Sequence, residues 1–299
     1  MIVFFFGVLL LGCTKEDLSQ CHNIFNLKFE YTNNADEIDK FAQDVDEVQV
    51  YVFNADGSYV DSYHGFINGL HTFQFPIELP YGTYDFVVWG GVPNSYTISN
   101  LSSYENAKLA IHPKDSIIDF ALADLFHGEL NNIKLTPAHK DSLPNISLIK
   151  NSNILNLTIK GVDLLPNSSR NNDLENRLTI SCQSKNGTHN FDNSIEPNAP
   201  LIHYTPYEQT TTSNTLRASI KTMRLLTNMK ATLVVHDTHT QTDLFNKDLI
   251  DLLLLLPTIN NDSDLDKYDT HNIEITIDAH LGVSVNINGY VVEGSESEI

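Results

Sequence analysis

Apolar residues alternate with polar ones over short runs throughout this chain, and most runs end at turn residues. Residues 48–53 alternate and then meet Asp56-Gly57, and in the second half Leu155, Leu157 and Ile159 share one face. A period of two places apolar side chains on one face of a β-strand, and glycine accepts the positive φ of a hairpin turn. The pattern therefore predicts an all-β chain.

Other segments show the same pattern and predict further strands. They lie at residues 72–75, 84–89, 117–122, 133–135, 178–182, 216–222, 232–235, 273–277 and 283–287. Short strands with turns about every 8–12 residues are typical of β-sandwiches. One helix is predicted from Asp248 to Leu256, because Pro257 ends it.

The length of 299 residues suits two domains of about 130 residues each better than one large one. A polar, turn-rich stretch at residues 140–152 indicates the boundary between them. The predicted organisation is a signal peptide at 1–12, a tether at 13–21, and β-sandwiches at 22–148 and 149–299. The two halves show no sequence repeat.

The N-terminus resembles that of a bacterial lipoprotein. An apolar stretch too short to span a bilayer ends in Leu10-Leu11-Gly12-Cys13, which is similar to a lipobox. Small Gly12 and Cys13 form the predicted signal-peptidase site, and the Cys13 thiol would take the lipid, whose buried CH₂ groups each contribute roughly 0.8 kcal/mol. One departure is that no Lys or Arg precedes Cys13. The alternative is a short buried strand with an incidental cysteine.

The residues after Cys13 bear on where such a lipoprotein would lie. Thr14-Lys15-Glu16-Asp17 resembles a signal for the outer face of the outer membrane. We therefore expect a lipid-anchored, surface-exposed protein of the outer membrane, although a solvated tether would have the same composition.

The net charge of −20 limits the possible partners. A surface of this sign repels phosphate backbones, so the sequence predicts no nucleic-acid binding. For the same reason, charge alone would not hold the chain to an anionic bilayer.

Few residues suggest chemistry. His236-Asp237-Thr238-His239 follows a predicted strand and is interpreted as a turn. His127, before Gly128, is interpreted as a structural histidine bonded to backbone at a strand start. Asp262, Asp264 and Asp266 have the spacing of a calcium loop, but Lys267 stands where that loop needs glycine. A solvated acidic loop is expected there, with Ca²⁺ binding left open. We expect no metal site, no cofactor and no enzyme activity.

Two cysteines lie outside the lipobox. Cys182 shares a strand face with Leu178 and Ile180, so it is expected in the core. An extracytoplasmic chain could pair it with Cys21, but the two fall in different predicted domains or at their edge, and free or structural thiols are expected.

The chain as a whole resembles the FimB-type minor fimbrial anchor lipoproteins of type V pili. The similarity rests on Val50-Tyr51-Val52-Phe53 with Asp56-Gly57, residues 82–91 ending in Trp89-Gly90-Gly91, Leu125-Phe126-His127-Gly128, Phe191-Asp192-Asn193, Tyr204-Thr205-Pro206 and Thr222-Met223-Arg224-Leu225-Leu226. One departure is Tyr290, where relatives would carry a Trp.

The resemblance implies two consecutive transthyretin-like β-sandwiches and a lipid anchor in the outer membrane. It also implies a non-catalytic role at the base of a surface pilus, where the protein fixes the shaft and can limit its length. The partners would be fimbrial shaft or accessory subunits.

The resemblance also bears on both ends of the chain. Shaft subunits of such pili are cut after an Arg and lose their first strand, but here no Arg precedes Arg170. The first strand, at 24–31, is therefore expected to stay. The C-terminal segment is the predicted shaft contact, because a strand near a chain end can pair elsewhere. Its residues are Val283, Val285, Ile287, Tyr290 and Val292; the alternative is an ordinary core strand.

The competing function is a surface glycan-binding lipoprotein, also built of β-sandwiches. Such proteins usually stack sugar rings on exposed aromatic platforms. The chain has one Trp, Trp89, which ends an apolar strand and is expected to be packed, while its 12 Tyr leave this alternative open.

Overall fold

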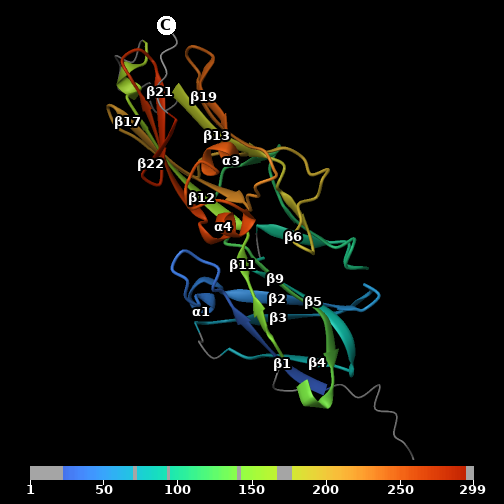
Figure 1. Ribbon diagram of the computed structural model, residues 1–299. Helices are drawn as coiled ribbons and strands as arrows, with labels where there is room; N and C mark the ends of the chain where they lie inside the picture. Colours follow the sequence, from blue (N-terminus) through green and yellow to red (C-terminus); the bar gives the residue numbers. More distant parts are fainter. Residues whose placement is uncertain (1–22, 70–72, 93–94, 140–142, 167–176, 294–299) are drawn as a thin grey trace, which may run out of the picture.

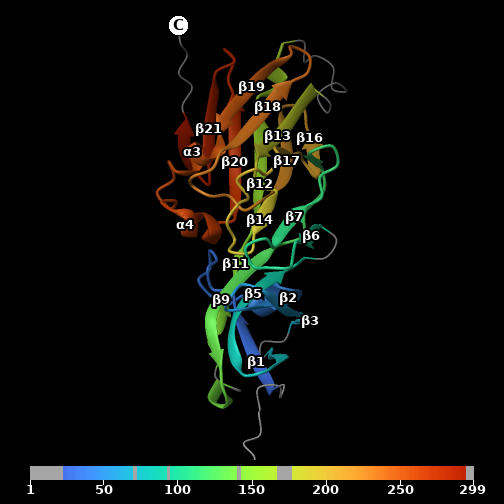
Figure 2. The ribbon, with the colours of Figure 1, turned by 90° about the vertical axis from the view of Figure 1, so that its right-hand side faces the viewer.

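The alternating segments form strands in a computed structural model that describes residues 23–69, 73–92, 95–139, 143–166 and 177–293. The described chain is nearly all β-structure and forms two β-sandwiches, so the predicted fold class is confirmed. The molecule is elongated, with the first half at one end and the second half at the other (Figures 1 and 2).

The first sandwich consists of a three-stranded sheet of order β10-β1-β4 and a five-stranded sheet of order β11-β9-β5-β2-β3. Phe25, Val50 and Phe86 lie between the two sheets and are fully buried. The elements are β1 (Asn23–Glu30), α1 (Phe41–Asp44), β2 (Glu47–Asn54), β3 (Tyr59–Phe66), β4 (Phe75–Leu79), β5 (Gly82–Gly90), β9 (Phe126–Leu135), the 3₁₀ helix η2 (Pro137–His139), β10 (Asn145–Ser147) and β11 (Ile149–Lys150).

The second sandwich consists of a six-stranded sheet, β16-β17-β12-β20-β21-β22, and a five-stranded sheet, β19-β18-β13-β15-β8. Leu155, Cys182 and Leu233 are fully buried in its core. The elements are β8 (Ile117–Ile118), β12 (Ser152–Lys160), the 3₁₀ helix η3 (Val162–Leu164), β13 (Leu178–Ser184), β15 (Ile202–Tyr204), β16 (Glu208–Thr211), β17 (Thr215–Met223), β18 (Ala231–Asp237), β19 (Thr242–Asp248), α3 (Leu249–Leu253), α4 (Asp262–Lys267), β20 (Thr270–Ile277), β21 (Val283–Ile287) and β22 (Tyr290–Glu293).

The two helices of the second half differ in how well the sequence predicts them. The helix expected from Asp248 is α3, where the Asp248 side chain caps the helix by accepting from the Ile250 amide, although the helix already ends at Leu253. The solvated acidic loop expected at residues 262–266 is instead the helix α4. Its carboxylates bind protein donors, since Asp266 accepts two hydrogen bonds from the Arg224 guanidinium.

The strands of the two halves correspond to one another, which the sequence does not reveal. In each half the first strand lies between a parallel neighbour and an antiparallel one: β1 between β10 and β4, and β12 between β20 and β17. The facing sheets correspond as well, because the order β9-β5-β2-β3 matches β19-β18-β13-β15. The hairpin β21–β22 is an addition to the second half, next to the strand that corresponds to β10.

One turn also recurs between corresponding strands. Asn54-Ala55-Asp56-Gly57-Ser58 and Asn190-Phe191-Asp192-Asn193-Ser194 have the same hydrogen bonds. In both turns, the serine hydroxyl donates to the aspartate at 2.6 Å. The asparagine side-chain amide donates to the oxygen of the same serine hydroxyl at 2.9 Å. Gly57 and Asn193 both have positive φ, so a short recurring motif marks equivalent positions.

The two halves exchange segments. The connection from β5 to β9 forms β6 (Tyr96–Ser99) and β7 (Lys108–Ile111) and then pairs β8 with β15 of the second half. In return, the connection from β13 to β15 forms β14 (Thr188–Asn190), which pairs with β7. Together with the sheet of the first sandwich that includes β11, three sheets of the described chain therefore contain strands from both sides of residue 148.

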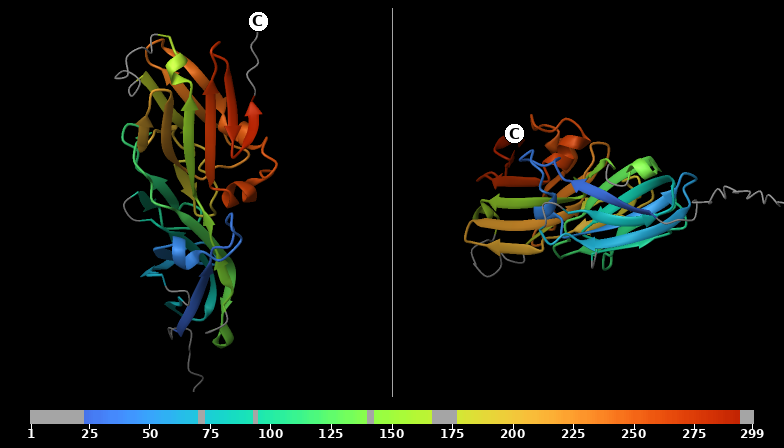
Figure 3. Two further views of the ribbon diagram at one scale, coloured as in Figure 1. Left: turned by 90° about the vertical axis from the view of Figure 1, so that its left-hand side faces the viewer. Right: turned by 90° about the horizontal axis from the view of Figure 1, so that it is seen from below.

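Aromatic residues fill the junction between the halves, which we call the waist. Trp89 of β5 is fully buried and packs edge-on against His127 and Phe191, with ring centroids 4.6 and 6.1 Å away. Tyr51 and Phe53 of β2 contact the same Phe191. The strands β2 and β5 thus have buried side chains on both faces of their sheet. Figure 3 shows the molecule with this junction from two further sides.

Buried polar groups add directional contacts at the waist. The side-chain amides of Asn151 and Asn193 donate hydrogen bonds to each other. The backbone N–H of Asn151 donates to the Leu125 carbonyl oxygen. Nearby, Asn186 donates to the Met223 and Arg224 carbonyls. Several of the sequence motifs that carry the family resemblance therefore meet in one place and hold the halves together.

A charge cluster lies beside this network. Asp124 of the β5–β9 connection accepts from Lys221 at 2.6 Å, and Lys150 bridges it to Asp269 at 2.8 Å. Burial opposes ionisation of Asp124, but the two ammonium groups hold the pKa of its carboxyl below the usual value.

We predict that Trp89→Ala lowers the free energy of unfolding by about 3–5 kcal/mol, because a large, fully buried side chain would leave a cavity at the waist. Thermal or denaturant unfolding measures the change. Phe66→Ala is the matched control, since Phe66 is 61% exposed and its removal should change stability by less than about 0.5 kcal/mol. Unchanged stability of the Trp89 variant would contradict the packing described.

We also predict that acid destabilises the fold. Burial lowers the pKa of His127 to about 3 and that of His271 to about 4, below the value near 6.5 expected in an unfolded chain. The unfolded chain then binds more protons, so stability is highest above about pH 6.5 and falls as the pH drops. The loss at pH 5 is about 2 kcal/mol per histidine.

Denaturant unfolding at pH 7 and pH 5 tests this prediction. Neither ring nitrogen of His271 has a hydrogen-bond partner in the described residues, so His271→Leu should lower the free energy of unfolding only slightly at pH 7. Below about pH 6.5 the variant should take up about one proton fewer on unfolding than the native chain, so its stability should depend less on pH. The exposed His280 supplies the control variant His280→Gln, whose pH dependence should match that of the native chain. If the free energy of unfolding of His271→Leu depends on pH as strongly as that of the native chain, the low pKa of His271 is wrong.

Candidate functional site

The predicted lipidation site precedes the described part of the chain. Gly12, Cys13 and Cys21 lie outside the described residues. Cys182 is a free thiol in the core, where burial raises its pKa to about 12. A thiol kept protonated by its apolar surroundings is unreactive, so Cys182 packs as expected and offers no chemistry.

The histidines considered as ligands have structural partners. His127 is buried at the start of β9, where its Nε2 lies 2.9 Å from the Phe191 carbonyl oxygen, as predicted. His236 and Asp237 are the last two residues of β18, so of the segment interpreted as a turn only Thr238 and His239 lie in one. Asp237 forms a buried two-point ion pair with Arg177. That guanidinium, together with hydrogen bonds, outweighs burial and holds the pKa of Asp237 at about 2. In the described ranges, no group of three His, Cys, Asp or Glu residues could hold a metal ion.

Trp89 is not a sugar platform. Its side chain is fully buried at the waist, in contact with His127 and Phe191. Because Trp89 is the one Trp of the sequence, this chain has no exposed Trp on which a sugar ring could stack.

The N-terminal strand is an integral part of the first sandwich. The strand expected at 24–31 is β1, which lies in the middle of its sheet between β10 and β4. Phe25 and Leu27 are fully buried, and Phe29 packs on an aromatic group that includes Phe41 and Phe75. Removing β1 would open the core of the first half along its length.

The residues of the predicted shaft contact lie on the added hairpin. Val285 and Ile287 of β21 are fully buried, while Val283 is half-buried. The second strand, β22, forms the edge of the six-stranded sheet, and β21 is its one partner among the described strands. Tyr290 and Val291 are 47% and 74% exposed there, and Val292 packs partly on the core. This edge presents free backbone groups beside apolar side chains.

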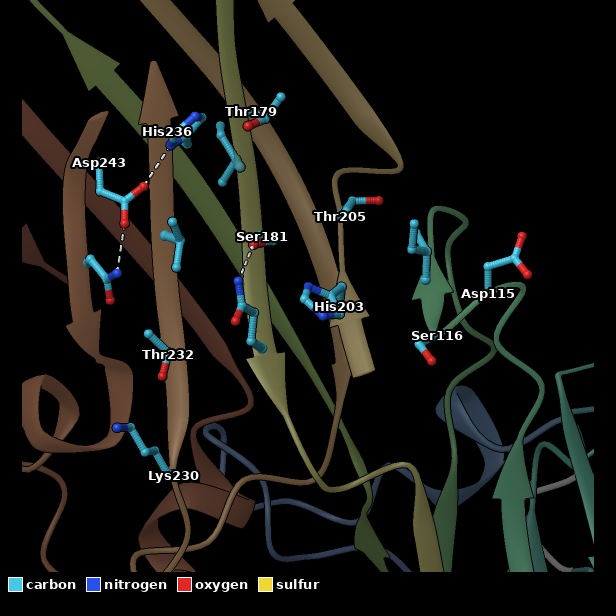
Figure 4. A pocket seen from close by; sticks show the side chains of 15 residues that line it. Asp115, Ser116, Thr179, Ser181, His203, Thr205, Lys230, Thr232, His236 and Asp243 are labelled. Atoms are coloured by element: carbon cyan, nitrogen blue, oxygen red, sulfur yellow. Dashed lines mark hydrogen bonds and ion pairs between the residues drawn. The ribbon is translucent and has the colours of Figure 1, made fainter. Parts of the chain in front are cut away.

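A polar pocket of about 700 Å³ lies on the open face of the β19-β18-β13-β15-β8 sheet. Figure 4 shows its floor: Thr179 and Ser181 come from β13, Thr232 and His236 from β18, and His203 from β15. Asp115 and Ser116, which precede β8, form one wall together with Ile117 at the start of that strand. No strand or helix of the described chain covers this face.

Internal hydrogen bonds orient the side chains of the pocket. His236 Nδ1 lies 2.7 Å from Asp243 Oδ1, and Asn246 donates to the other oxygen of the same carboxylate at 2.8 Å. The wall is fixed through the His203 amide, which donates to the Ser116 carbonyl oxygen at 2.8 Å. Segments from both halves of the chain therefore build the pocket.

Sequence reasoning did not find this pocket, although part of its signal was present. Thr179, Ser181 and Gln183 alternate with the core residues of β13, so the polar face of that strand could have been identified. The pairing of β8 with β15, which adds the wall, leaves no local mark in the sequence.

Comparisons with known proteins bear on the whole chain. No described helix is long and apolar enough to cross a bilayer, and no curated protein matches the chain. Among solved structures, a Bacteroides thetaiotaomicron protein, named as a suspected polysaccharide-binding protein, has a TM-score of 0.80 at 23% identity and covers 92% of this chain and 99% of its own. The fimbrial anchor protein Mfa2 of Porphyromonas gingivalis has a TM-score of 0.75 at 18% identity, covering 92% and 100%.

At such identities the solved structures support the fold alone. The assignment to a family rests on a family model, described as fimbrillin-A associated anchor proteins Mfa1 and Mfa2, that matches residues 18–296. Because this match extends over nearly the whole length, the chain belongs to the family of fimbrillin-A associated anchor proteins.

Proposed function

We propose that this protein anchors a fimbria to the outer membrane as a lipoprotein, without catalysis, and that it ends the fimbria at the cell and so limits its length. The lipid would be attached at Cys13. Family membership supports the anchor role, and the lipobox-like residues at 10–13 support the attachment.

The observation that carries the proposal is the position of β1. It is the first strand after the tether, and it is already paired on both sides within its own sheet. A polymerising subunit needs an open groove that accepts a strand from its neighbour. Here the place is filled by the chain's own β1, with Phe25 and Leu27 fully buried. A permanently filled groove suits a subunit that ends a polymer and does not extend it.

The surface proposed to contact the shaft is the open edge of β22. It lies toward the end of the molecule opposite β1, so the lipid and the fimbria would attach at opposite ends (Figures 1 and 2). Tyr290 and Val291 would pair with an extended strand of a shaft or accessory subunit. Val283, Val285 and Ile287 would support this edge from β21, while Val292 anchors β22 on the core.

We predict that Cys13→Ala releases the protein from the outer membrane, and releases the fimbriae with it into the medium, because the acyl chains are lost. Cell fractionation and electron microscopy of shed fimbriae measure both effects. Cys182→Ala is the control, since that thiol is buried in the core and should leave attachment unchanged.

Mass spectrometry of the native, membrane-bound protein completes this test. It should find acylated Cys13 as the first residue, followed by an intact β1. A mature chain that starts after Tyr31, or a Cys13 variant that stays in the membrane, would contradict the proposal.

We predict that Tyr290→Lys combined with Val291→Lys sheds fimbriae while the protein itself stays on the cell. Charges on an open edge disfavour strand addition, and both side chains are exposed enough for the fold to tolerate them. Leu255→Lys is the matched control, since Leu255 is 61% exposed but lies beyond α3. Normal retention of fimbriae by the double variant would show that β22 is not the contact.

A further inference from the structure

The correspondence between the two halves draws attention to the polar pocket. The sheet of β2 and β5 in the first half corresponds to the sheet of β13 and β18 in the second. In the first half its outer face carries Tyr51, Phe53 and Trp89, and the β6-β7-β14 segments and Phe191 cover it. The equivalent face of the second half carries hydroxyl, amide and imidazole groups beside the apolar side chains of Val234 and Ile117, and no strand or helix of the described chain covers it.

This difference limits what the second face can bind. An apolar strand or helix laid over Thr179, Ser181 and Gln183 would bury hydroxyl and amide groups and leave many of them without partners. The cover of the first half shows what such a docked segment requires, namely large apolar side chains on the sheet. The second face therefore suits a ligand that is itself rich in hydroxyl groups.

The charges and the size of the site further limit the class of ligand that it can bind. The lining contains Lys230 with Asp115 and Asp243, so neither sign dominates strongly in a chain of net charge −20. A second cavity of about 420 Å³ adjoins the first, because Lys230 lines both, and it adds the apolar side chains of Leu226 and Met229. Each cavity has the size usual for a small-molecule site, about 300–1,000 Å³, and we call the two neighbouring cavities the cleft.

We propose that this cleft binds a neutral oligosaccharide. Sugar hydroxyls donate and accept, as do the hydroxyls of Ser181 and Thr232, and the amides of Gln183 and Asn246 supply paired donors and acceptors. Asp243 holds both His236 and Asn246 in fixed orientations before the ligand arrives, which lowers the entropy cost of binding. The apolar C–H faces of the sugar rings contact Leu226 and Met229.

Affinity electrophoresis of the full chain through gels that contain mannan, dextran or starch tests the proposal, with alginate as the anionic comparison. At least one neutral polysaccharide should retard the native protein. Ser181→Trp should reduce that affinity at least tenfold, since an indole fills the floor of the pocket from a position that points away from the core. Gln183→Ala should reduce it about three- to tenfold.

Thr158→Trp is the matched control. Thr158 lines a smaller polar cavity of about 350 Å³ on the outer face of the neighbouring sheet, so the same substitution there should leave binding unchanged. Circular dichroism verifies that both Trp variants fold, and retention of fimbriae on cells should be normal in both, which separates this site from the anchor role.

Three results would overturn the proposal. The first is a native protein that none of the neutral polysaccharides retards, which would identify the cleft as a solvated sheet face. The second is equal binding by the native chain and folded Ser181→Trp, or equal loss in the two Trp variants. The third is retardation by alginate alone, which would assign the site to an anionic ligand.

Discussion

The burial of one sheet on both faces is the interaction on which the rest of this structure depends. The strands β2 and β5 pack on one side against the core of the first sandwich, and on the other against segments exchanged between the halves. Trp89 and Phe191 meet at this second face. Because each half supplies part of the cover, the first sandwich cannot keep its apolar outer face dry without the second. We therefore expect the two sandwiches to unfold together, although each has its own core.

The same dependence explains the distribution of polar residues. In a chain with a formal charge of −20, cations are scarce, and several of them are held in buried or half-buried pairs near the waist and in the second core. Arg177 binds Asp237, Arg224 binds Asp266, and Lys221 binds Asp124. Breaking one partner of such a pair leaves an uncompensated buried charge. The first two pairs therefore specify the packing of the second half, and the Lys221–Asp124 pair also joins the two halves.

The sequence predicts the parts of this fold that have a local cause. Alternation identified strands such as β2, β5 and β12, the positions of Cys182 and His127 followed from their immediate neighbours, and Asp248 marked the start of α3. Two expected strands were placed wrongly: the strand predicted to end at Phe75 begins there and runs through Pro76 to Leu79, and the strand predicted at 117–122 is limited to β8. The exchange of β8 and β14 could not be predicted, because a strand pattern, even where it is present at residues 117–122, does not indicate which distant strand is the partner. The helix α4 was missed since its aspartates, interpreted as calcium ligands or a solvated loop, bind protein donors instead. Asp266 accepts from Arg224 and Asp262 from the Thr227 amide, while Asn261 caps the helix. The polar cleft also depends on the pairing of β8 with a distant strand, because the start of β8 forms part of one of its walls. The correspondence of the two halves became visible only in the strand pairing, apart from a five-residue turn that recurs in the sequence.

The position of β1 has a mechanical consequence. Its described start, Asn23, lies at one end of the elongated molecule, and the strand runs inward between two hydrogen-bonded neighbours (Figure 1). Hydrogen bonds in a sheet lie across the strands, so tension applied to the tether acts along β1 and loads the bonds to β4 and β10 in shear. Bonds loaded in shear share the tension and must fail together, whereas bonds peeled from one end fail in turn. In a chain held by its N-terminus, as proposed above, a strand that enters its sheet lengthwise would thus give the first sandwich its greatest resistance in the direction in which a fimbria would pull on it.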